Sequence, residues 1–136
     1  MDVEDYTRAL RQCKVGGLRM RRSRSDLRAA SPDQVRLSAK VVEEHSVCQA
    51  SEHEVLLQVT FALTAPHIDS RAVALRLEAC FELAISSPVP LPEGFAEQYA
   101  ATSLPFNVWP YFRQWVSATT AQAGLPPLTL GFRFLQ

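Results

Sequence analysis

The middle of the chain alternates hydrophobic and polar residues with a period of two, which is typical of half-buried β-strands. Three stretches follow this pattern and keep their apolar side chains on one face: Val35 to Val41, Val55 to Leu63 and Val73 to Ile85. The connections between them, residues 49–53 and 66–70, are short and polar. Clean alternation with short connections predicts antiparallel strands in a meander, with one face of the sheet buried.

The first quarter of the chain has a weaker pattern. Residues 14–24 are compatible with one more strand, supported chiefly by Leu18 and Met20, although the pair Gly16-Gly17 dilutes the alternation. Residues 1–12 could form either an N-terminal arm or a short amphipathic helix. The sheet is therefore expected to have four strands.

After the strands, the period changes to that of a helix. Three prolines make residues 86–92 a stiff crossover loop, because proline fixes φ and removes a hydrogen-bond donor. Residues 93–102 predict one helix, and Pro105 is expected to end it. A second helix is predicted from an N-cap at Asn107, with Pro110 in its first turn, to about residue 123.

The second helix is expected to end at Gly124, a residue suited to the left-handed conformation that closes many helices. The tail then alternates again at Leu128, Leu130, Phe132 and Phe134, as an extended segment does. Together these elements predict an α+β fold of two layers: a four-stranded antiparallel sheet (meander) with one face covered by a long interrupted helix. The length suits one domain, residues 1–136.

The helical part carries almost no charge. Between Gln98 and Phe132 the only ionisable Asp, Glu, Lys or Arg is Arg113, although a helix that covers one sheet face normally has a charged outer face. One stripe of the second helix would pack on the sheet, and another on a second copy of the chain. The alternative is that the N-terminal arm or the tail covers it. The predicted oligomer interface comprises Tyr111, Phe112, Trp115, Ala118 and Gln122.

Apolar and aromatic residues also gather where the crossover loop and the two predicted helices meet. Buried rings contribute roughly 2–3 kcal/mol each, so a few of them make a usable but reversible binding site. This junction could line a groove for an extended apolar peptide, or its residues could simply belong to the core. The candidate groove comprises Leu91, Phe95, Tyr99, Phe106 and Trp109.

Charge is balanced overall but not along the chain. The 14 basic and 14 acidic residues give a net charge of zero, which predicts no nucleic-acid partner. Residues 1–28 nevertheless hold eight bases and four acids, a surplus of four positive charges, and the rest holds six bases and ten acids. The basic focus, residues 19–28, is either a patch for phosphate or an acidic partner, or an edge strand whose arginines discourage aggregation.

The cysteine count and the termini indicate the compartment. Three widely spaced cysteines, Cys13, Cys48 and Cys80, argue against a disulfide scaffold and favour a reducing environment. The acidic start is not that of a signal peptide. Residues 114–132 lack charge, but a glycine, two prolines and several polar residues in this stretch exclude a membrane helix. We therefore expect a cytoplasmic protein without a membrane contact.

The sequence contains little that would support catalysis or metal binding. His45, Cys48 and His53 have the wrong spacing and number for a zinc site, and we expect no metal, no cofactor and no catalytic residue. Cys80 has no histidine with an obvious route to it, and the pair Glu78 and Glu82 is expected to be a solvated or partner-facing surface. The competing class is a small-molecule-binding or thioesterase-like enzyme on an α+β sheet.

The stretch NVWPYFRQWVSATTAQAGLPPLTL, residues 107–130, resembles the C-terminal signature of SecB-type chaperones, especially the SecB-like branch associated with toxin–antitoxin pairs. The opening Asn107, Trp109, Pro110 and the aromatic pair before Arg113 match that branch, as do the Thr-rich helix and the Gly-Leu-Pro-Pro-Leu exit from Gly124. The order of the predicted strands before it fits the family as well, which extends the resemblance to residues 10–130.

This resemblance implies a homotetramer, a dimer of dimers with helices between the dimers. It also implies an ATP-independent holdase for unfolded or aggregation-prone polypeptides. Clients could be a cognate antitoxin or a preprotein in protein transport. Handover to the SecA motor is doubtful, because export members are strongly acidic and carry a further C-terminal helix, whereas this chain is neutral and stops at Gln136.

Overall fold

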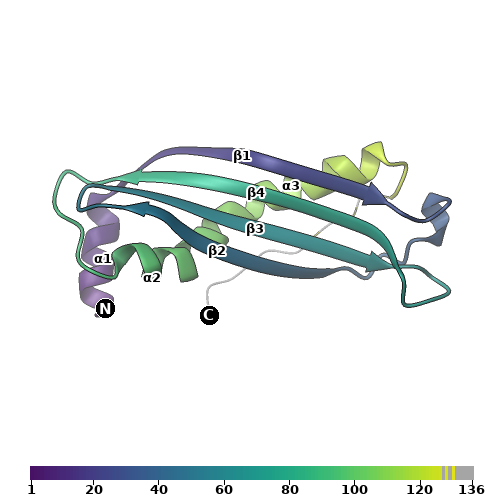
Figure 1. Ribbon diagram of the computed structural model, residues 1–136, viewed down its shortest axis with the longest axis horizontal. Helices are drawn as coiled ribbons and strands as arrows, with labels where there is room; N and C mark the ends of the chain where they lie inside the picture. Colours follow the sequence, from purple (N-terminus) through teal and green to yellow (C-terminus); the bar gives the residue numbers. More distant parts are fainter. Residues whose placement is uncertain (127, 129, 131–136) are drawn as a thin grey trace.

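The computed structural model describes residues 1–126, 128 and 130 (Figure 1). The N-terminal residues form a helix rather than an arm, and Asp2 caps it by accepting a hydrogen bond from the Glu4 backbone N–H at 3.1 Å. The elements are α1 (Val3–Gln12), β1 (Lys14–Leu27), the 3-10 helix η1 (Pro32–Gln34), β2 (Lys40–Ala50), β3 (Glu54–Pro66), β4 (Val73–Ser86), α2 (Phe95–Ala101) and α3 (Ser103–Gln122).

The four strands form one antiparallel sheet in the order β1-β4-β3-β2. The predicted α+β class is therefore confirmed, and the strands predicted at 14–24, 55–63 and 73–85 correspond to β1, β3 and β4. The meander, however, comprises β2 to β4. β1 pairs with β4 instead of β2, so that the chain crosses to the far edge of the sheet after β1. β1 and β2 are consequently the two edge strands.

The strand predicted at residues 35–41 was placed too early. Val35 is buried and makes an isolated bridge with His67, but β2 begins only at Lys40 and pairs with β3 as far as Ala50. The inner side of β2 includes Glu43 and His45, which hide the alternation from sequence analysis. An edge strand can carry such residues because its inner face is only partly covered.

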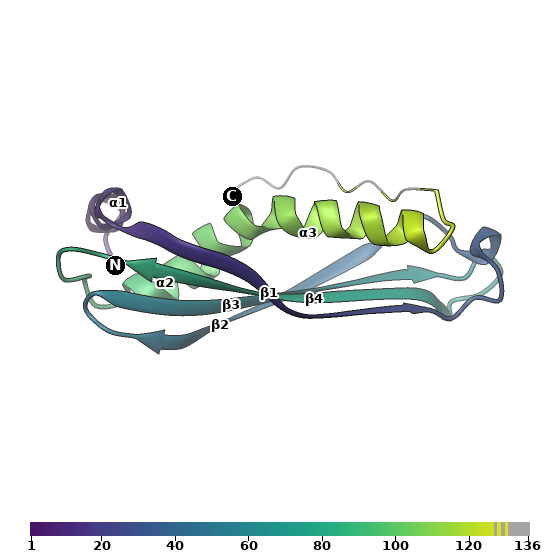
Figure 2. The ribbon, with the colours of Figure 1, turned by 90° about the horizontal axis from the view of Figure 1, so that it is seen from above.

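The helices lie on one face of the sheet (Figure 2). α3 packs over β3 and β4, α2 over β2 and β3, and α1 against α2. The core between the layers includes Leu57, Val59, Phe61 and Leu63 of β3, each 0% exposed. Burial of side chains of this size contributes roughly 1.5–3 kcal/mol each. No described helix covers the opposite face of the sheet, which we call the open face.

The interruption between the helices lies at Thr102, three residues before the predicted break. A continuous helix would need an N–H at Pro105 and would place its ring against the Ala101 carbonyl. Starting α3 at Ser103 puts Pro105 in the first turn, where no donor is required. The predicted N-cap at Asn107 is therefore wrong, and Pro110 lies inside the helix rather than in its first turn.

The end of α3 is the one predicted. Gly124 has φ +81°, its N–H donates to the Ala121 carbonyl at 3.1 Å, and the Leu125 N–H donates to the Thr120 carbonyl at 3.0 Å. This is a Schellman motif, which needs a left-handed residue. In the predicted extended tail, Leu128 is buried and Leu130 is half-buried, whereas Phe132 and Phe134 lie outside the described residues.

Candidate functional site

The crossover loop is fixed against the β2–β3 turn. The backbone N–H of Ser87 donates to the His53 carbonyl at 2.8 Å, and that of Leu91 donates to the Glu52 carbonyl at 2.7 Å. The His53 ring Nδ1 lies 3.0 Å from the Ser87 carbonyl. These bonds hold the proline-rich loop in one position and bury Leu91.

Gly94 directs the chain from this loop into α2. Its φ is +86°, a conformation that glycine adopts without steric cost. The first residue of α2, Phe95, is 1% exposed, and the Tyr6 ring of α1 lies 5.5 Å from its ring centroid. The Tyr6 hydroxyl is 2.6 Å from Ser103 Oγ. Helix α1 therefore covers the part of the α2–α3 junction around Phe95 and Ser103.

A hydrogen bond spans the break between the two helices. The Asn107 side-chain amide donates to the Tyr99 hydroxyl at 2.9 Å. Burial of Tyr99 raises its pKa above the usual value, and the Asn107 bond opposes only part of this effect. Asn107 thus fixes the angle between α2 and α3 instead of capping a helix.

A row of aromatic rings joins α3 to the sheet. The Phe112 ring stacks on Phe61 of β3 with centroids 4.9 Å apart, and Trp109 meets Phe61 edge-on at 5.5 Å. Trp115 extends the row, 6.0 Å from Phe112. Aromatic pairs at such distances add to the stabilisation from burial. Trp109 and Trp115 are half-buried, so each keeps part of its surface accessible.

The five predicted groove residues separate into two depths. Leu91, Phe95 and Tyr99 are buried in the core, at 9%, 1% and 3% exposure. Phe106 is 36% exposed, and Trp109 is half-buried. The first three residues therefore belong to the core, whereas Phe106 and Trp109 keep part of their surface accessible.

The outer side of α3 faces an open depression of about 700 Å³ between this helix and β1. Among the predicted interface residues, Tyr111 is 54% exposed, Ala118 and Gln122 are exposed, and Trp115 is half-buried. Phe112 is fully buried beneath them. The depression is lined by Val15, Leu18, Arg19, Met20, Phe81, Tyr111, Gln114, Trp115 and Ala118.

Sequence analysis missed the contribution of β1 to this surface. Val15 is 60% exposed and Met20 is 38% exposed, on the same side of the sheet as α3. The signal was present as the alternation of Leu18 and Met20. The sequence pattern did not reveal the strand order, and only the pairing of β1 with β4 brings these residues beside α3.

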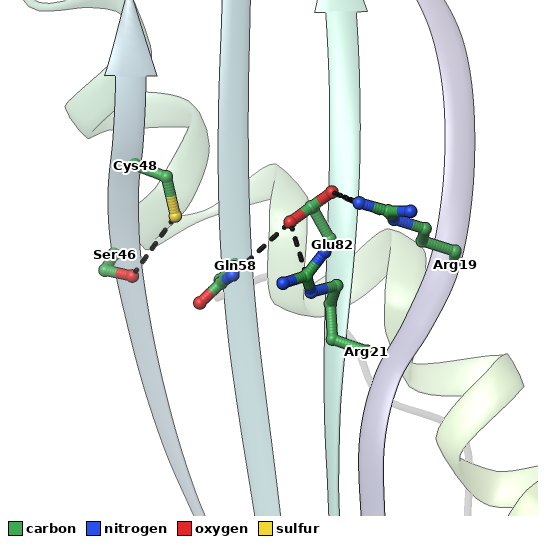
Figure 3. A network of polar contacts seen from close by, with 6 residues as sticks. All are labelled: Arg19, Arg21, Ser46, Cys48, Gln58 and Glu82. Carbon is green, nitrogen blue, oxygen red and sulfur yellow. Dashed lines mark hydrogen bonds and ion pairs between the residues drawn. The ribbon is translucent and has the colours of Figure 1, made fainter.

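The open face of the sheet holds a compact charge network (Figure 3). Glu82 of β4 accepts a hydrogen bond from Arg19 Nε at 3.0 Å, lies 3.7 Å from Arg21 Nε, and accepts a longer bond from Gln58 at 3.4 Å. Burial alone would raise the Glu82 pKa. The bonds from Arg19 and Gln58 and the positive charge of both arginines outweigh burial and lower this pKa below its usual value.

The residues considered for metal or catalytic chemistry are dispersed. His45 and Cys48 lie on β2 and His53 lies in the β2–β3 turn, and Cys80 is buried in β4. Within residues 1–126, 128 and 130, no three His, Cys, Asp or Glu side chains converge as a metal site would require. None of the helices in this part of the chain has the length and apolar character to span a membrane.

Comparison with known proteins identifies the fold. No protein-family model and no curated protein matches the chain. Among solved structures, the SecB-like chaperone of Mycobacterium tuberculosis, in complex with a ChAD peptide from an antitoxin, superimposes with a TM-score of 0.76 at 20% identity. The match covers 96% of this chain and 97% of that one.

A protein of unknown function from Streptococcus agalactiae is a more distant match, with a TM-score of 0.54 at 11% identity over 88% of this chain and 97% of that one. The SecB-like match spans the sheet, the interrupted helix and the junction between them. This chain therefore has the fold of a SecB-like chaperone, as the resemblance of residues 107–130 predicted.

Proposed function

We propose that the chain is a cytoplasmic, ATP-independent holdase that binds unfolded or aggregation-prone polypeptides. The observation that carries the proposal is the pair of exposed apolar surfaces on one interrupted helix, at the junction and along the outer side of α3, on a SecB-like fold. The SecB-like neighbour is complexed with an antitoxin peptide, which makes a cognate antitoxin a fitting client.

The client groove would lie at the junction of α2 and α3. Phe106 and Trp109 would bind apolar side chains of the client, and the unpaired edge of β2 would supply backbone hydrogen bonds. Glu43 of β2 pairs in register with Phe61, which contacts Trp109, so this edge runs close to the rings. Leu91, Phe95 and Tyr99 would shape the groove from beneath.

The second surface would join copies of the chain into a homotetramer, a dimer of dimers. Tyr111, Trp115, Ala118 and Gln122 of α3 would meet a second copy, together with Val15 and Met20 of β1. Exposed apolar residues on two adjacent elements are typical of such contacts. Each single groove binds weakly, and repeating it in one assembly raises the overall affinity for a long client. We assign no handover to SecA.

The test is suppression of aggregation without nucleotide. The purified full chain should lower light scattering by heat-denatured citrate synthase at a stoichiometry near one tetramer per client. Phe106→Asp should weaken suppression at least fivefold, because a carboxylate replaces an apolar contact at the groove. Ile68→Asp is the matched control, since Ile68 is similarly exposed, at 42%, but lies in the β3–β4 turn.

Two results would contradict the proposal: no suppression by the wild-type chain, or equal loss in both variants. The competing enzyme class predicts instead that the chain leaves aggregation unchanged and binds a discrete small molecule.

A further inference from the structure

The arginines of β1 share one face of the sheet because of a β-bulge. β1 pairs with β4 in register up to Met20, opposite Phe81, and again from Arg22, opposite Cys80, so that Arg21 is an extra residue. Strict alternation from Arg19 would turn Arg22 and Arg24 towards the helices. The bulge reverses their direction, and bulges commonly re-aim side chains in this way.

Arg19, Arg21, Arg22 and Arg24 consequently lie together on the open face, and we call this set the arginine face. Arg22 lies opposite Cys80 and Arg24 opposite Glu78, and Cys80, Glu78 and Glu82 alternate with inward-facing Ala79 and Phe81. The ion pairs of Arg19 and Arg21 with Glu82 confirm this side for the first two residues (Figure 3).

The internal acids do not neutralise the arginine face. Glu82 is shared by Arg19 and Arg21, and these two side chains are still 64% and 46% exposed. Glu78 pairs with Arg76 at 3.6 Å. Arg22 and Arg24 are exposed and make no ion pair with any described residue. Asp26, opposite Arg76, is paired with Arg28 at 3.0 Å. The four arginines with Arg28 and Arg76, against Asp26, Glu78 and Glu82, leave a local surplus of three positive charges.

We propose that the arginine face binds an extended acidic segment of a polypeptide. Along a strand, alternate residues on one face are about 6.6 Å apart, so Arg22 and Arg24 match two carboxylates placed on alternate residues of an extended chain. Arginine suits this role because its planar guanidinium forms paired hydrogen bonds with a carboxylate. A single exposed pair is weak, and binding therefore requires several of them.

An acidic peptide fits this surface better than a nucleic acid does. The arginine face covers six residues of strand, about 17 Å. Glu78 and Glu82 lie within or beside it, and Glu44 and Glu54 lie on the open face towards the other edge of the sheet. A phosphate backbone that followed the sheet beyond β1 would meet these carboxylates. The inference is independent of the proposed function, because the open face is opposite the client groove and α3.

The experiment uses the purified full chain and a fluorescein-labelled peptide of five Glu-Ser repeats, followed by anisotropy in 20 mM NaCl. Binding should be saturable, and should weaken at least tenfold in 300 mM NaCl because the contacts are exposed. Arg22→Glu with Arg24→Glu should weaken binding at least tenfold. Arg22→Gln with Arg24→Gln, which adds no repulsion with Glu78, should weaken it about threefold.

The matched control is Arg11→Glu with Arg71→Glu. It makes the same change in net charge at exposed arginines of α1 and of the β3–β4 turn, neither of which has an ion pair with a described residue. The control should bind the peptide within twofold of the wild type. Circular dichroism melts of each variant establish that it is folded.

Three results would overturn the inference: no saturable binding in 20 mM NaCl, equal weakening in the control, or tighter binding of a ten-residue oligothymidine than of the peptide. Aggregation suppression, measured on the same variants, separates this inference from the proposed function. The arginine variants should keep full suppression of citrate synthase aggregation, and a failure of suppression in the wild type leaves the peptide result unaffected.

Discussion

The two sides of α3 are alike in sequence and different in environment. The inner side places Leu104, Val108, Phe112 and Val116 at 0–1% exposure against the sheet. The outer side, with Tyr111, Trp115 and Ala118, is equally free of charge, yet Tyr111 is 54% exposed and the described residues leave a depression beside it. A helix with two apolar sides that is covered on only one of them leaves the other apolar side in contact with water.

This difference shows that the absence of charge does not tell which side of a helix packs within the chain. A core side and a proposed intersubunit side both exclude ionisable residues, because both would be removed from water. They differ in what a substitution should change. Damage to the inner side should lower the stability of each chain, and damage to the outer side should lower the association of chains.

The largest effect is expected for Phe112→Ala. Phe112 is 0% exposed and stacks on Phe61, so its truncation removes buried area and leaves a cavity, at a cost of about 3–5 kcal/mol in the free energy of unfolding. Urea denaturation followed by circular dichroism measures this loss. Phe106→Ala is the control on the same helix. Because Phe106 is 36% exposed, its truncation loses only part of the roughly 1.5–3 kcal/mol that a fully buried Phe contributes, and it should cost about 1–2 kcal/mol. Equal losses would mean that Phe112 is no more tightly packed than the partly exposed Phe106.

The second effect is on assembly. Tyr111→Glu places a charge in the proposed interface and should raise the dissociation constant of the oligomer at least 100-fold, which is about 2.8 kcal/mol. Multi-angle light scattering at decreasing concentration measures this shift. Val42→Glu is the control, because Val42 is also 54% exposed but lies on the open face of the sheet. An unchanged oligomer in Tyr111→Glu, or a monomeric wild type, would remove the outer side from the interface.

Sequence analysis predicted β3 and β4 well because both strands are central and alternate cleanly over their whole length. It failed on β2 because Glu43 and His45 occupy inner positions of an edge strand, where backbone pairing rather than side-chain burial decides the structure. The bulge at Arg21 was equally invisible, since a single extra residue changes the face of every residue after it without changing composition.

The depth of the candidate-site residues could not be predicted. Sequence analysis assigned Tyr111 and Phe112 to the same predicted interface, but Tyr111 is 54% exposed and Phe112 is fully buried. It likewise grouped Phe95, which is 1% exposed, with Phe106, which is 36% exposed. Whether a ring is buried depends on elements far away in the chain: Tyr6 covers Phe95, and Phe61 covers Phe112. Local sequence patterns contain no information on such contacts. The interruption at Thr102 was not predicted either, because the first turn of α3 can accommodate Pro105.

A smaller effect on stability is expected at the C-terminal end of α3, where the helix is closed by Gly124. Gly124→Ala forces an alanine to φ +81° and should cost about 1 kcal/mol in the free energy of unfolding. A Cβ there would be 3.6 Å from Pro32 Cγ, an ordinary contact, so the cost is conformational. The oligomer should keep its dissociation constant within threefold. Gly17→Ala, with open space around its Cβ and no positive φ, should not destabilise the chain.

The smallest effect concerns the open face, which touches neither side of α3. Glu82 has a lowered pKa in the folded chain, so its ion pairs stabilise the fold above the unfolded-state pKa near 4.5. That stabilisation is lost as the pH falls through the lower folded-state value. Glu82→Gln should therefore be less stable than the wild type at pH 7, and the gap should narrow below pH 4.5.

Urea denaturation at pH 7 and at pH 3 checks the sign of this difference. A gap that widened in acid would mean that Glu82 is protonated in the folded chain and that Arg19 and Arg21 do not hold its charge. The same variant sharpens the comparison between the two faces of the sheet. Because Glu82 lies opposite the helix layer, its loss should leave both assembly and aggregation suppression unchanged, while releasing two arginines to bind the Glu-Ser peptide more tightly.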